Sequence, residues 1–318
     1  SLASLEGDNN AEIRRQLARV FGEMADPRGK SVLIRLLEDP SARVRSMAAF
    51  GLAKVGAPEA REELFQMGLE AWPNDPVLHH SAVMGLAGSC TEADLILEGL
   101  KRDASKERRM LALLALRKKH HPWWLFAGVP GERETSNGSP AEQRDPETLR
   151  NAGLRYRTKS GDITRVHRVC RSLDLFFNDP DPEVVAEATR AIHDLYGLDS
   201  MPRLADLLIR LTRLDSDALS QYGDWIWPVG RRAIDAALRH GGAAHLRALI
   251  DFAGRTEVPQ ELRLLSLENA AVWNQPPVRE GVRGLVRPVV EGQRQPSFDT
   301  GKAVEDSLSK LLESGPLQ

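Results

Sequence analysis

Apolar side chains recur every three or four positions over residues 184–195 and again over residues 201–211. This spacing places the side chains of each run on one face of an α-helix. Gly197 lies between the two runs, where a residue in the left-handed conformation commonly ends a helix. The segment 179–211 is therefore predicted to form two short amphipathic helices joined by a glycine turn.

The beginning of this segment carries residues that favour a helix N-terminus. The side chain of Asp181 is placed to accept a hydrogen bond from a free backbone amide of the first turn. Pro182 suits the first helical position because it has no amide hydrogen to satisfy, and Glu183 is favoured by the positive end of the helix dipole. We therefore expect the helix to begin at Pro182, capped by Asp181.

The same pattern recurs along the chain. The segment 39–56 aligns without a gap with the segment 75–90 when Val44 is placed on Leu78. The alignment then pairs Ala48 with Ala82, Gly51 with Gly85, and Leu52 with Leu86. Fainter copies place Ile13, Val184 and Leu262 at the same position, which gives successive intervals of 31, 34, 106 and 78 residues. Because one hairpin cannot bury two apolar faces alone, we expect the copies to stack on one another.

This pattern resembles HEAT repeats, whose first helix typically begins at an Asp-Pro pair and whose apolar positions match Val44, Ala48 and Leu52. The resemblance implies an all-α chain with the HEAT/armadillo-like α-α superhelix, a right-handed solenoid of helical hairpins. The composition agrees, since 42% of the residues are hydrophobic but only 5% are aromatic. Few β-branched or aromatic runs are present that would form a sheet.

The repeats are predicted to be interrupted once. The segment 121–161 is rich in Gly, Pro, Ser and charge and lacks helical periodicity, so we interpret it as an irregular insertion or mobile loop. The predicted organisation is N-terminal HEAT-like repeats at 1–120, the insertion at 121–161, C-terminal HEAT-like repeats at 162–290, and a linker with the start of a further helix at 291–318. Within the repeats we expect hairpins at 10–37, 39–68 and 75–100, a helix at 101–119, and an irregular link at 215–230 before a helix at 231–240.

Charge and hydropathy exclude some classes of partner. The net charge of −2 gives no overall attraction for nucleic acid or for an anionic membrane. The longest apolar run, Met110–Leu116, is far shorter than the roughly 20 residues of a membrane span. No signal peptide is recognisable, and we expect the chain to be a segment of a longer protein. Cys90 and Cys170 are expected to be buried free thiols.

The chain contains no HExxH, GxSxG, GxGxxG, CxxC or glycine-rich phosphate-binding motif. The adjacent histidine pairs are His79–His80 and His120–His121. Neighbouring side chains on a helix point about 100° apart, which disfavours joint chelation of one ion. Carboxylates are common, but most lie at helix starts, where capping explains them. We therefore predict no catalytic residue, no cofactor site and no metal site in this chain.

Two groups of residues are predicted to bind protein. Arginine and tryptophan are enriched at interface hot spots, and both groups adjoin irregular segments that a partner could order. The first group lies on the basic helix predicted at 101–119, and the second at the junction that precedes the helix at 231–240. The alternative interpretation is a solvated basic face for the first group and tryptophans that fill a packing gap for the second. The candidate residues are Lys101, Arg102, Arg108 and Arg109 in the first group, and Trp225, Trp227, Arg231 and Arg232 in the second.

Two further stretches carry a more specific resemblance. The run RRAIDAALRHGGAAHLRALIDFAG at 231–254, followed by VPQELRLLSLENAAVWNQPPVREGVRGLVRPV at 258–289, resembles the HEAT-repeat section of large multidomain haem-binding, membrane-bound dehydrogenase-like proteins of bacteria. In that family a sugar-dehydrogenase-like propeller precedes the section and a c-type cytochrome segment with CxxCH follows it. The resemblance implies a periplasmic or cell-envelope location, with haem c held only by a cytochrome segment outside this sequence.

Three hypotheses for function follow. The favoured one is a non-catalytic HEAT-repeat scaffold that holds neighbouring domains of the same chain or a protein partner. The second is a solenoid enzyme, resembling alkylpurine DNA glycosylases or bilin lyases, although a glycosylase needs a strongly basic groove. The third is an electron-transfer module with its own cofactor, for which no ligand set is visible. The segment itself is thus predicted not to be an enzyme and not to bind nucleic acid or a small-molecule substrate.

Overall fold

The computed structural model describes residues 2–120, 172–195 and 200–285, together with isolated positions between 289 and 309. All the secondary-structure elements within these ranges are helices, so the predicted all-α fold is confirmed. The chain divides into two compact units, Ser1–His121 and Pro122–Gln318. Within the described ranges, no helix is both long and apolar enough to cross a membrane.

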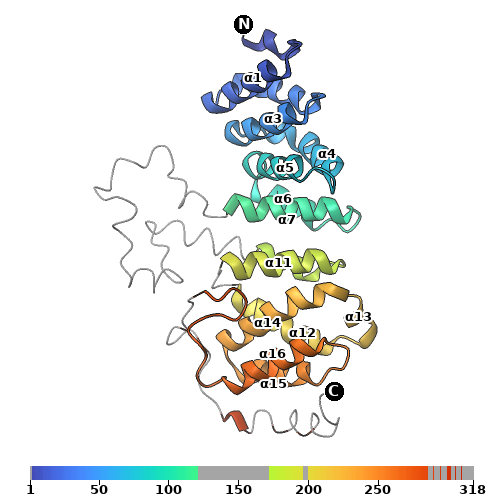
Figure 1. The fold of residues 1–318 in the computed structure, drawn as a ribbon, viewed down its shortest axis with the longest axis vertical. Coiled ribbons are helices and arrows are strands. Elements are labelled where there is room, and N and C mark those ends of the chain that lie inside the picture. Colours follow the sequence, from blue (N-terminus) through green and yellow to red (C-terminus); the bar gives the residue numbers. More distant parts are fainter. Residues whose placement is uncertain are drawn as a thin grey trace, which may run out of the picture. The chain divides into compact units, whose positions relative to one another are not determined.

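The first unit is a stack of helical hairpins (Figure 1). Helix α3 packs between α1 and α5, and α5 packs in turn on α4 and α7. A pair of helices lies in each of the three ranges where a hairpin was predicted in this part of the chain. Its elements are η1 (Leu2–Gly7), α1 (Ala11–Met24), η2 (Pro27–Gly29), α2 (Lys30–Arg35), η3 (Leu36–Glu38), α3 (Ala42–Val55), η4 (Pro58–Ala60), α4 (Arg61–Ala71), α5 (Pro76–Ser89), α6 (Glu92–Gly99) and α7 (Lys106–His120).

The second unit is organised around one helix, α14, which contacts α11, α12, α15 and α16. This explains why α14 buries apolar side chains along nearly its whole length. The elements of this unit are η5 (Asp174–Asn178), α11 (Pro182–Leu195), α12 (Met201–Arg213), α13 (Ser216–Ser220), η6 (Gly223–Trp225), α14 (Ile226–His240), α15 (Ala243–Ala253) and α16 (Gln260–Ala271).

The prediction of an irregular link at 215–230 is wrong, because most of this segment is helical. The side chain of Asp215 caps α13 by accepting a hydrogen bond of 2.7 Å from the amide of Ala218. Helix α14 begins at Ile226, five residues earlier than predicted. Pro228 is tolerated there because the first turn of a helix has amides with no intrahelical partner.

An aspartate turn of the same geometry begins a helix in both units. The side chain of Asp39 accepts a hydrogen bond of 2.8 Å from the amide of Ser41, and Asp179 accepts one of 2.8 Å from the amide of Asp181. Each aspartate directly follows a short 3-10 helix. Asp181 also accepts a hydrogen bond of 2.9 Å from the amide of Glu183, which confirms the predicted cap. Asp39-Pro40 and Asp179-Pro180 therefore each mark the start of a new helical repeat.

The predicted pairing of Gly51 with Gly85 reflects equivalent packing. A Cβ atom added to Gly51 would lie 2.9 Å from the Leu33 side chain and 3.2 Å from a carbonyl oxygen of α1. One added to Gly85 would lie 2.6 Å from the Leu64 side chain and 3.3 Å from a carbonyl oxygen of α3. The aligned Ala48 and Ala82, and Ala188 in α11, are fully buried. Small residues thus occupy the places where successive helices meet most closely.

Cys90 is a buried free thiol, as predicted. Burial raises the pKa of this thiol to about 11. Nearby, the ammonium group of Lys119 donates hydrogen bonds to the carbonyl oxygens of Ala87 and Cys90, at 3.1 and 2.8 Å. Because cations favour the negative end of a helix, this contact stabilises the C-terminus of α5.

Several predictions concern parts of the chain outside the described residues. These are the insertion at 121–161, the turn at Gly197, the second cysteine at Cys170, and nearly all of the segment 291–318.

We predict that replacing Gly88 by alanine destabilises the first unit. The added Cβ atom would lie 2.2 Å from the carbonyl oxygen and 2.5 Å from the Cα atom of Ala53, and backbone atoms of this kind cannot move aside cheaply. We expect a loss of about 1–3 kcal/mol in the free energy of unfolding, measured by chemical denaturation. For the net effect to be a loss, the steric cost has to exceed the stabilisation of about 1 kcal/mol that alanine gives over glycine within a helix.

Gly7→Ala is the control, because a Cβ atom at Gly7 would meet nothing within 4 Å. The denaturation midpoint of Gly88→Ala should lie below that of the unmodified chain. If it is equal or higher, α5 does not pack on α3 with Gly88 against Ala53.

Candidate functional site

The first predicted protein-binding group does not lie on one helix. Helix α7 begins only at Lys106, so Lys101 and Arg102 lie in the connection between α6 and α7. The hydroxyl of Ser105 accepts a hydrogen bond of 3.2 Å from the amide of Arg108, which is the contact of a helix cap. The prediction of a continuous helix at 101–119 is therefore wrong at its start, where Ser105 begins a new helix.

Arg108 and Arg109 make contacts within the stack. The guanidinium of Arg108 bonds to Glu62 at 2.8 and 2.9 Å and to Glu98 at 3.0 Å, and it lies 4.2 Å from the centre of the Phe65 ring. Arg109 is buried and donates a hydrogen bond of 2.6 Å to the carbonyl oxygen of Ala104. These two arginines thus tie α7 to α4, α6 and the preceding turn. Protein binding by this group stays a prediction, and Lys101 and Arg102 are its exposed members.

The contacts of Glu98 make the stability of the first unit depend on pH. Burial alone would raise the pKa of Glu98, but hydrogen bonds from Lys101 and Arg108 lower it below its usual value. The folded-state pKa is therefore below the unfolded-state value of about 4.3. The carboxylate stabilises the fold above that pH, and the contribution is lost as the pH falls through the folded-state pKa.

We predict that Glu98→Gln lowers the free energy of unfolding by roughly 1–3 kcal/mol at pH 7, because Arg108 loses a charged partner. The difference from the unmodified chain should shrink as the pH falls below about 4.3. Denaturation curves at several pH values measure both effects. The exposed Glu70→Gln is the control, and a Glu98→Gln difference that is the same at pH 3 and pH 7 would contradict this assignment.

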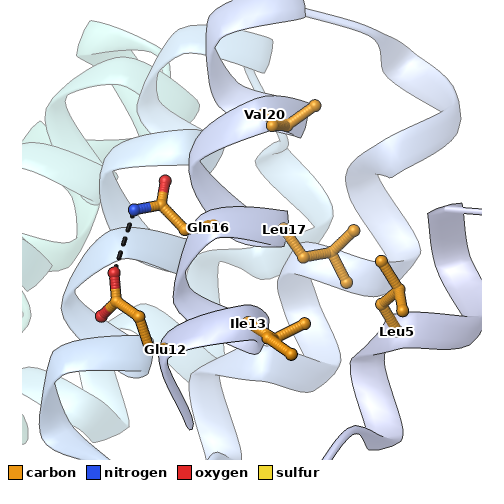
Figure 2. Close-up of a pocket in the computed structure, with 6 residues that line it drawn as sticks. All are labelled: Leu5, Glu12, Ile13, Gln16, Leu17 and Val20. Atoms are coloured by element: carbon orange, nitrogen blue, oxygen red, sulfur yellow. Dashed lines mark hydrogen bonds between the residues drawn. The ribbon is translucent and has the colours of Figure 1, made fainter. Parts of the chain in front are cut away.

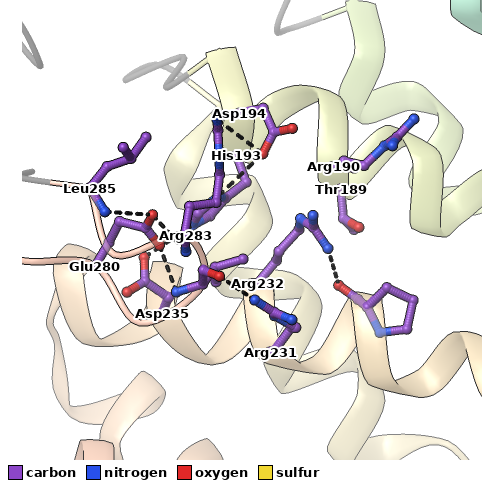
Figure 3. Close-up of polar contacts among 12 residues, drawn as sticks. Thr189, Arg190, His193, Asp194, Arg231, Arg232, Asp235, Glu280, Arg283 and Leu285 are labelled. Carbon is purple, nitrogen blue, oxygen red and sulfur yellow. Dashed lines mark hydrogen bonds and ion pairs between the residues drawn. The ribbon is translucent and has the colours of Figure 1, made fainter.

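The second predicted group does come together, at the start of α14. Trp225 and Trp227 are 42% and 39% exposed although they adjoin a well-packed helix. The guanidinium of Arg231 lies 6.0 Å from the centre of the Trp227 ring and donates a hydrogen bond to the carbonyl oxygen of Val282. Arg232 donates one of 3.0 Å to the carbonyl oxygen of Pro228 (Figure 3).

Several arginines lie in this region, and one of them, Arg190, is paired with Glu187 at 2.7 Å. Burial lowers the pKa of the Arg232 guanidinium, Asp194 opposes this effect, and the nearby charges of Arg231 and Arg190 lower the pKa further. Among the described residues, Nε of Arg232 is buried without a hydrogen-bond partner. We call Trp225, Trp227, Arg231, Arg232 and Arg190 the α14 surface.

A buried polar cluster lies near the α14 surface (Figure 3). Nε2 of His193, on α11, is 3.2 Å from Oδ2 of Asp235, on α14, and 3.7 Å from Oε2 of Glu280. All three residues are buried, and their exposed fractions are 0%, 3% and 1%. Because both neighbours of Nε2 are carboxylate oxygens, this nitrogen carries a hydrogen and donates it. We call these three residues the buried cluster.

Each carboxylate of the buried cluster also accepts hydrogen bonds from residues outside the cluster. Oδ1 of Asp235 accepts hydrogen bonds from the amide of Gly281 at 3.1 Å and from Arg239 at 3.2 Å. Burial would raise the pKa of Asp235, but His193 and Arg239 lower it below the usual value.

The side chain of Glu280 organises its own loop, 279–285. It accepts hydrogen bonds from the amides of Val282 at 2.6 Å, Arg283 at 2.8 Å and Leu285 at 3.3 Å. The loop is therefore wrapped around a single carboxylate, which contacts His193 of α11, and the amide of Gly281 joins the loop to Asp235 of α14.

Sequence reasoning missed the buried cluster. Its members come from three separate segments, and no motif joins them. A signal was present in RRAIDAALRH, where Asp235 and Arg239 lie four residues apart on an apolar helix face. A charged pair in such a position predicts a buried ionic contact, but it does not predict the partners His193 and Glu280.

An apolar hollow of about 230 Å³ lies beside α1 in the first unit (Figure 2). Its polar members, Glu12 and Gln16, bond to each other at 2.9 Å and offer nothing specific to a ligand. The structure therefore identifies no occupant for it. The lining residues are Leu5, Glu12, Ile13, Gln16, Leu17 and Val20.

Comparison with known proteins supports the repeat architecture. The family model of HEAT repeats matches residues 2–87. This stretch runs from η1 into α5 and includes the aligned segments around Val44 and Leu78. The resemblance to HEAT repeats is thus confirmed for this part of the chain, whereas the resemblance to haem-binding dehydrogenase-like proteins stays a prediction.

Two solved structures, both of engineered proteins from the Northeast Structural Genomics Consortium, are similar to the chain at 18% and 16% identity. The first alignment covers 86% of this chain and 96% of the other, with a TM-score of 0.29. The second covers 99% and 91%, with a TM-score of 0.26. No curated protein matches the sequence. TM-scores this low do not support any conclusion about function.

Proposed function

We propose that this chain is a non-catalytic helical-repeat scaffold that binds an acidic protein partner through the α14 surface. HEAT-type solenoids offer extended surfaces to other proteins, and the fold is of this type. The partner can be a neighbouring domain of the same protein or a separate chain.

The α14 surface carries the proposal because it combines exposed aromatic area with an incompletely bonded cation. Trp225 and Trp227 keep much of their surface exposed. Nε of Arg232 is buried with no partner among the described residues, so the free protein carries the cost of an unmade hydrogen bond. Arg231 and Arg232 are only partly buried, so a carboxylate from a partner would form charge-assisted bonds with the accessible nitrogens of their guanidinium groups. Tryptophan and arginine are also the side chains that most often dominate interface energies.

The class of partner follows from charge and from the resemblance noted in the sequence. Arg231 and Arg232 favour a surface that carries Asp and Glu, whereas the charge of Arg190 is already paired with Glu187 at 2.7 Å. The haem-binding dehydrogenase-like proteins place a c-type cytochrome segment after their HEAT section, so an acidic face of such a domain is our candidate. A periplasmic or cell-envelope location belongs to the same proposal.

The proposal is tested by titrating the full chain with a c-type cytochrome domain that has an acidic face, using isothermal titration calorimetry. We predict that Trp227→Ala weakens binding by at least about tenfold, because an exposed aromatic anchor is removed. Arg232→Met should weaken binding by a similar factor while leaving the melting temperature unchanged or raised. Methionine keeps the apolar stem but removes the unmade hydrogen bond.

The matched control is Arg247→Met, which removes an exposed arginine from α15. It should leave the affinity unchanged. If Arg232→Met lowers the melting temperature by many degrees and leaves binding intact, Arg232 serves the fold alone and the proposal fails. Binding of duplex DNA that weakens steeply with salt would instead favour the glycosylase-like alternative.

A further inference from the structure

We propose that the buried cluster of His193, Asp235 and Glu280 is a binding site for a divalent transition-metal ion, with Zn²⁺ the best-suited ion. The proposal is independent of the α14 surface and of its partner. It rests on three ligand atoms, one imidazole nitrogen and two carboxylate oxygens, that all lie within 4.8 Å of one another in the interior of the second unit.

The distances suit a small ion with tetrahedral geometry. Neighbouring ligand atoms around zinc lie roughly 3.3 Å apart when each bond is about 2.0–2.1 Å long. Nε2 of His193 lies 3.2 Å from Oδ2 of Asp235 and 3.7 Å from Oε2 of Glu280. The carboxylate oxygens of Asp235 and Glu280 lie within 4.8 Å of each other, so the three ligand atoms surround a common point that an ion would occupy. The three protein ligands leave one position of a tetrahedral shell to a non-protein group.

The atoms around the cluster act as an outer shell that fixes the ligands. Nδ1 of His193 lies 3.9 Å from Oδ1 of Asp194, which is beyond hydrogen-bonding distance, so this carboxylate does not fix the orientation of the ring. The amide of Gly281 holds Asp235, and amides of the loop 279–285 hold Glu280. Metal-binding carboxylates are commonly oriented by hydrogen bonds of the kind that hold Asp235 and Glu280.

The charges at this place would accommodate a further cation. Asp235 and Glu280 carry two negative charges, and the guanidinium of Arg239, 3.0 Å from Oδ2 of Asp235, compensates one. Burial makes the remaining negative charge costly unless it is paired. In the structure the hydrogen on Nε2 of His193 faces both carboxylates. A metal ion would replace this hydrogen, which leaves to solvent as a proton while the nitrogen lone pair binds the ion.

The donor set selects the class of metal. Mg²⁺ and Ca²⁺ prefer sites made only of oxygen atoms, whereas imidazole favours zinc and its neighbours among the transition metals. The role we assign is structural. An ion bound by all three residues would fasten the loop 279–285 to α11 and α14, and this loop also accepts the hydrogen bond of Arg231 through Val282.

The experiment uses the full chain, unfolded and refolded in the presence of Co²⁺ or Zn²⁺ so that the buried site can load. We expect one equivalent of metal to remain after desalting, measured by elemental analysis. The bound Co²⁺ should show the visible absorption of a tetrahedral site, and the melting temperature should rise with the concentration of free Zn²⁺. X-ray absorption at the zinc edge of the unmodified chain should report one imidazole and two carboxylate oxygens among the ligands.

Two variants locate the metal. His193→Gln should lower the affinity by more than about 100-fold, since loss of even an outer-shell contact commonly costs 10–100-fold. His245→Gln is the matched control, because His245 is a buried histidine that pairs with a single carboxylate, Asp206, at 3.0 Å. It should bind metal as the unmodified chain does.

The proposal is overturned if the refolded, unmodified chain retains no metal and shows no tetrahedral Co²⁺ spectrum. His193 would then serve only as a hydrogen-bond donor to the two carboxylates. Full binding by His193→Gln would overturn it as well, because the ion would then lie elsewhere. If His193→Gln does not fold, the X-ray absorption of the unmodified chain still decides, and a zinc shell without one imidazole and two carboxylates contradicts the assignment.

Discussion

A helical hairpin has two apolar faces and can bury only one of them against itself, and the whole of this structure depends on that constraint. The hairpins therefore stack, and the spacing between them is set by the smallest side chains at the contact. Gly51 and Gly85 occupy equivalent contacts, and Gly88 meets the backbone of Ala53 directly. The aspartate turns at Asp39 and Asp179 then direct the chain into the next helix.

Charges inside the stack are compensated by neighbours from other helices. Arg14 of α1 bonds to Asp39 at 2.5 and 2.9 Å, and Arg108 of α7 bonds to Glu98 of α6. Such contacts cost nearly as much in desolvation as they return, but breaking one leaves a poorly hydrated charge. They fix the register of the helices. Arg232 forms no ion pair of this kind, and its buried Nε is one of several buried polar atoms that have no hydrogen-bond partner among the described residues.

The fold could be predicted from the sequence to the extent that it is local. Helical periodicity, the cap at Asp181 and the equivalence of Gly51 and Gly85 all concern residues a few positions apart, or one repeat apart. The helical character of 215–230 was missed because Gly223 and Pro228 are common in irregular segments, although both fit helix starts here.

The candidate sites were predicted unevenly for the same reason. The second group could be predicted because its members, Trp225, Trp227, Arg231 and Arg232, are close in sequence. The structural role of Arg108 could not be predicted from the sequence, because its partner Glu62 lies 46 residues away. His193 and Asp235 are 42 residues apart and meet only because α11 packs on α14. Contacts of this kind depend on tertiary packing, which periodicity alone does not specify.

The central claim is that the chain functions by presenting the α14 surface to an acidic protein. Hydrogen exchange of the full chain, followed by mass spectrometry with and without the cytochrome domain, tests this most directly. The amide of Ile226 bonds to the carbonyl oxygen of Gly223 in the short 3-10 turn that precedes α14, and hydrogen bonds at helix ends open more readily than those in the middle of a helix. The account predicts slower exchange at 223–232 in the complex and unchanged exchange in α1 to α5. Unchanged exchange at 223–232, with slowing confined to residues 2–120, would contradict it.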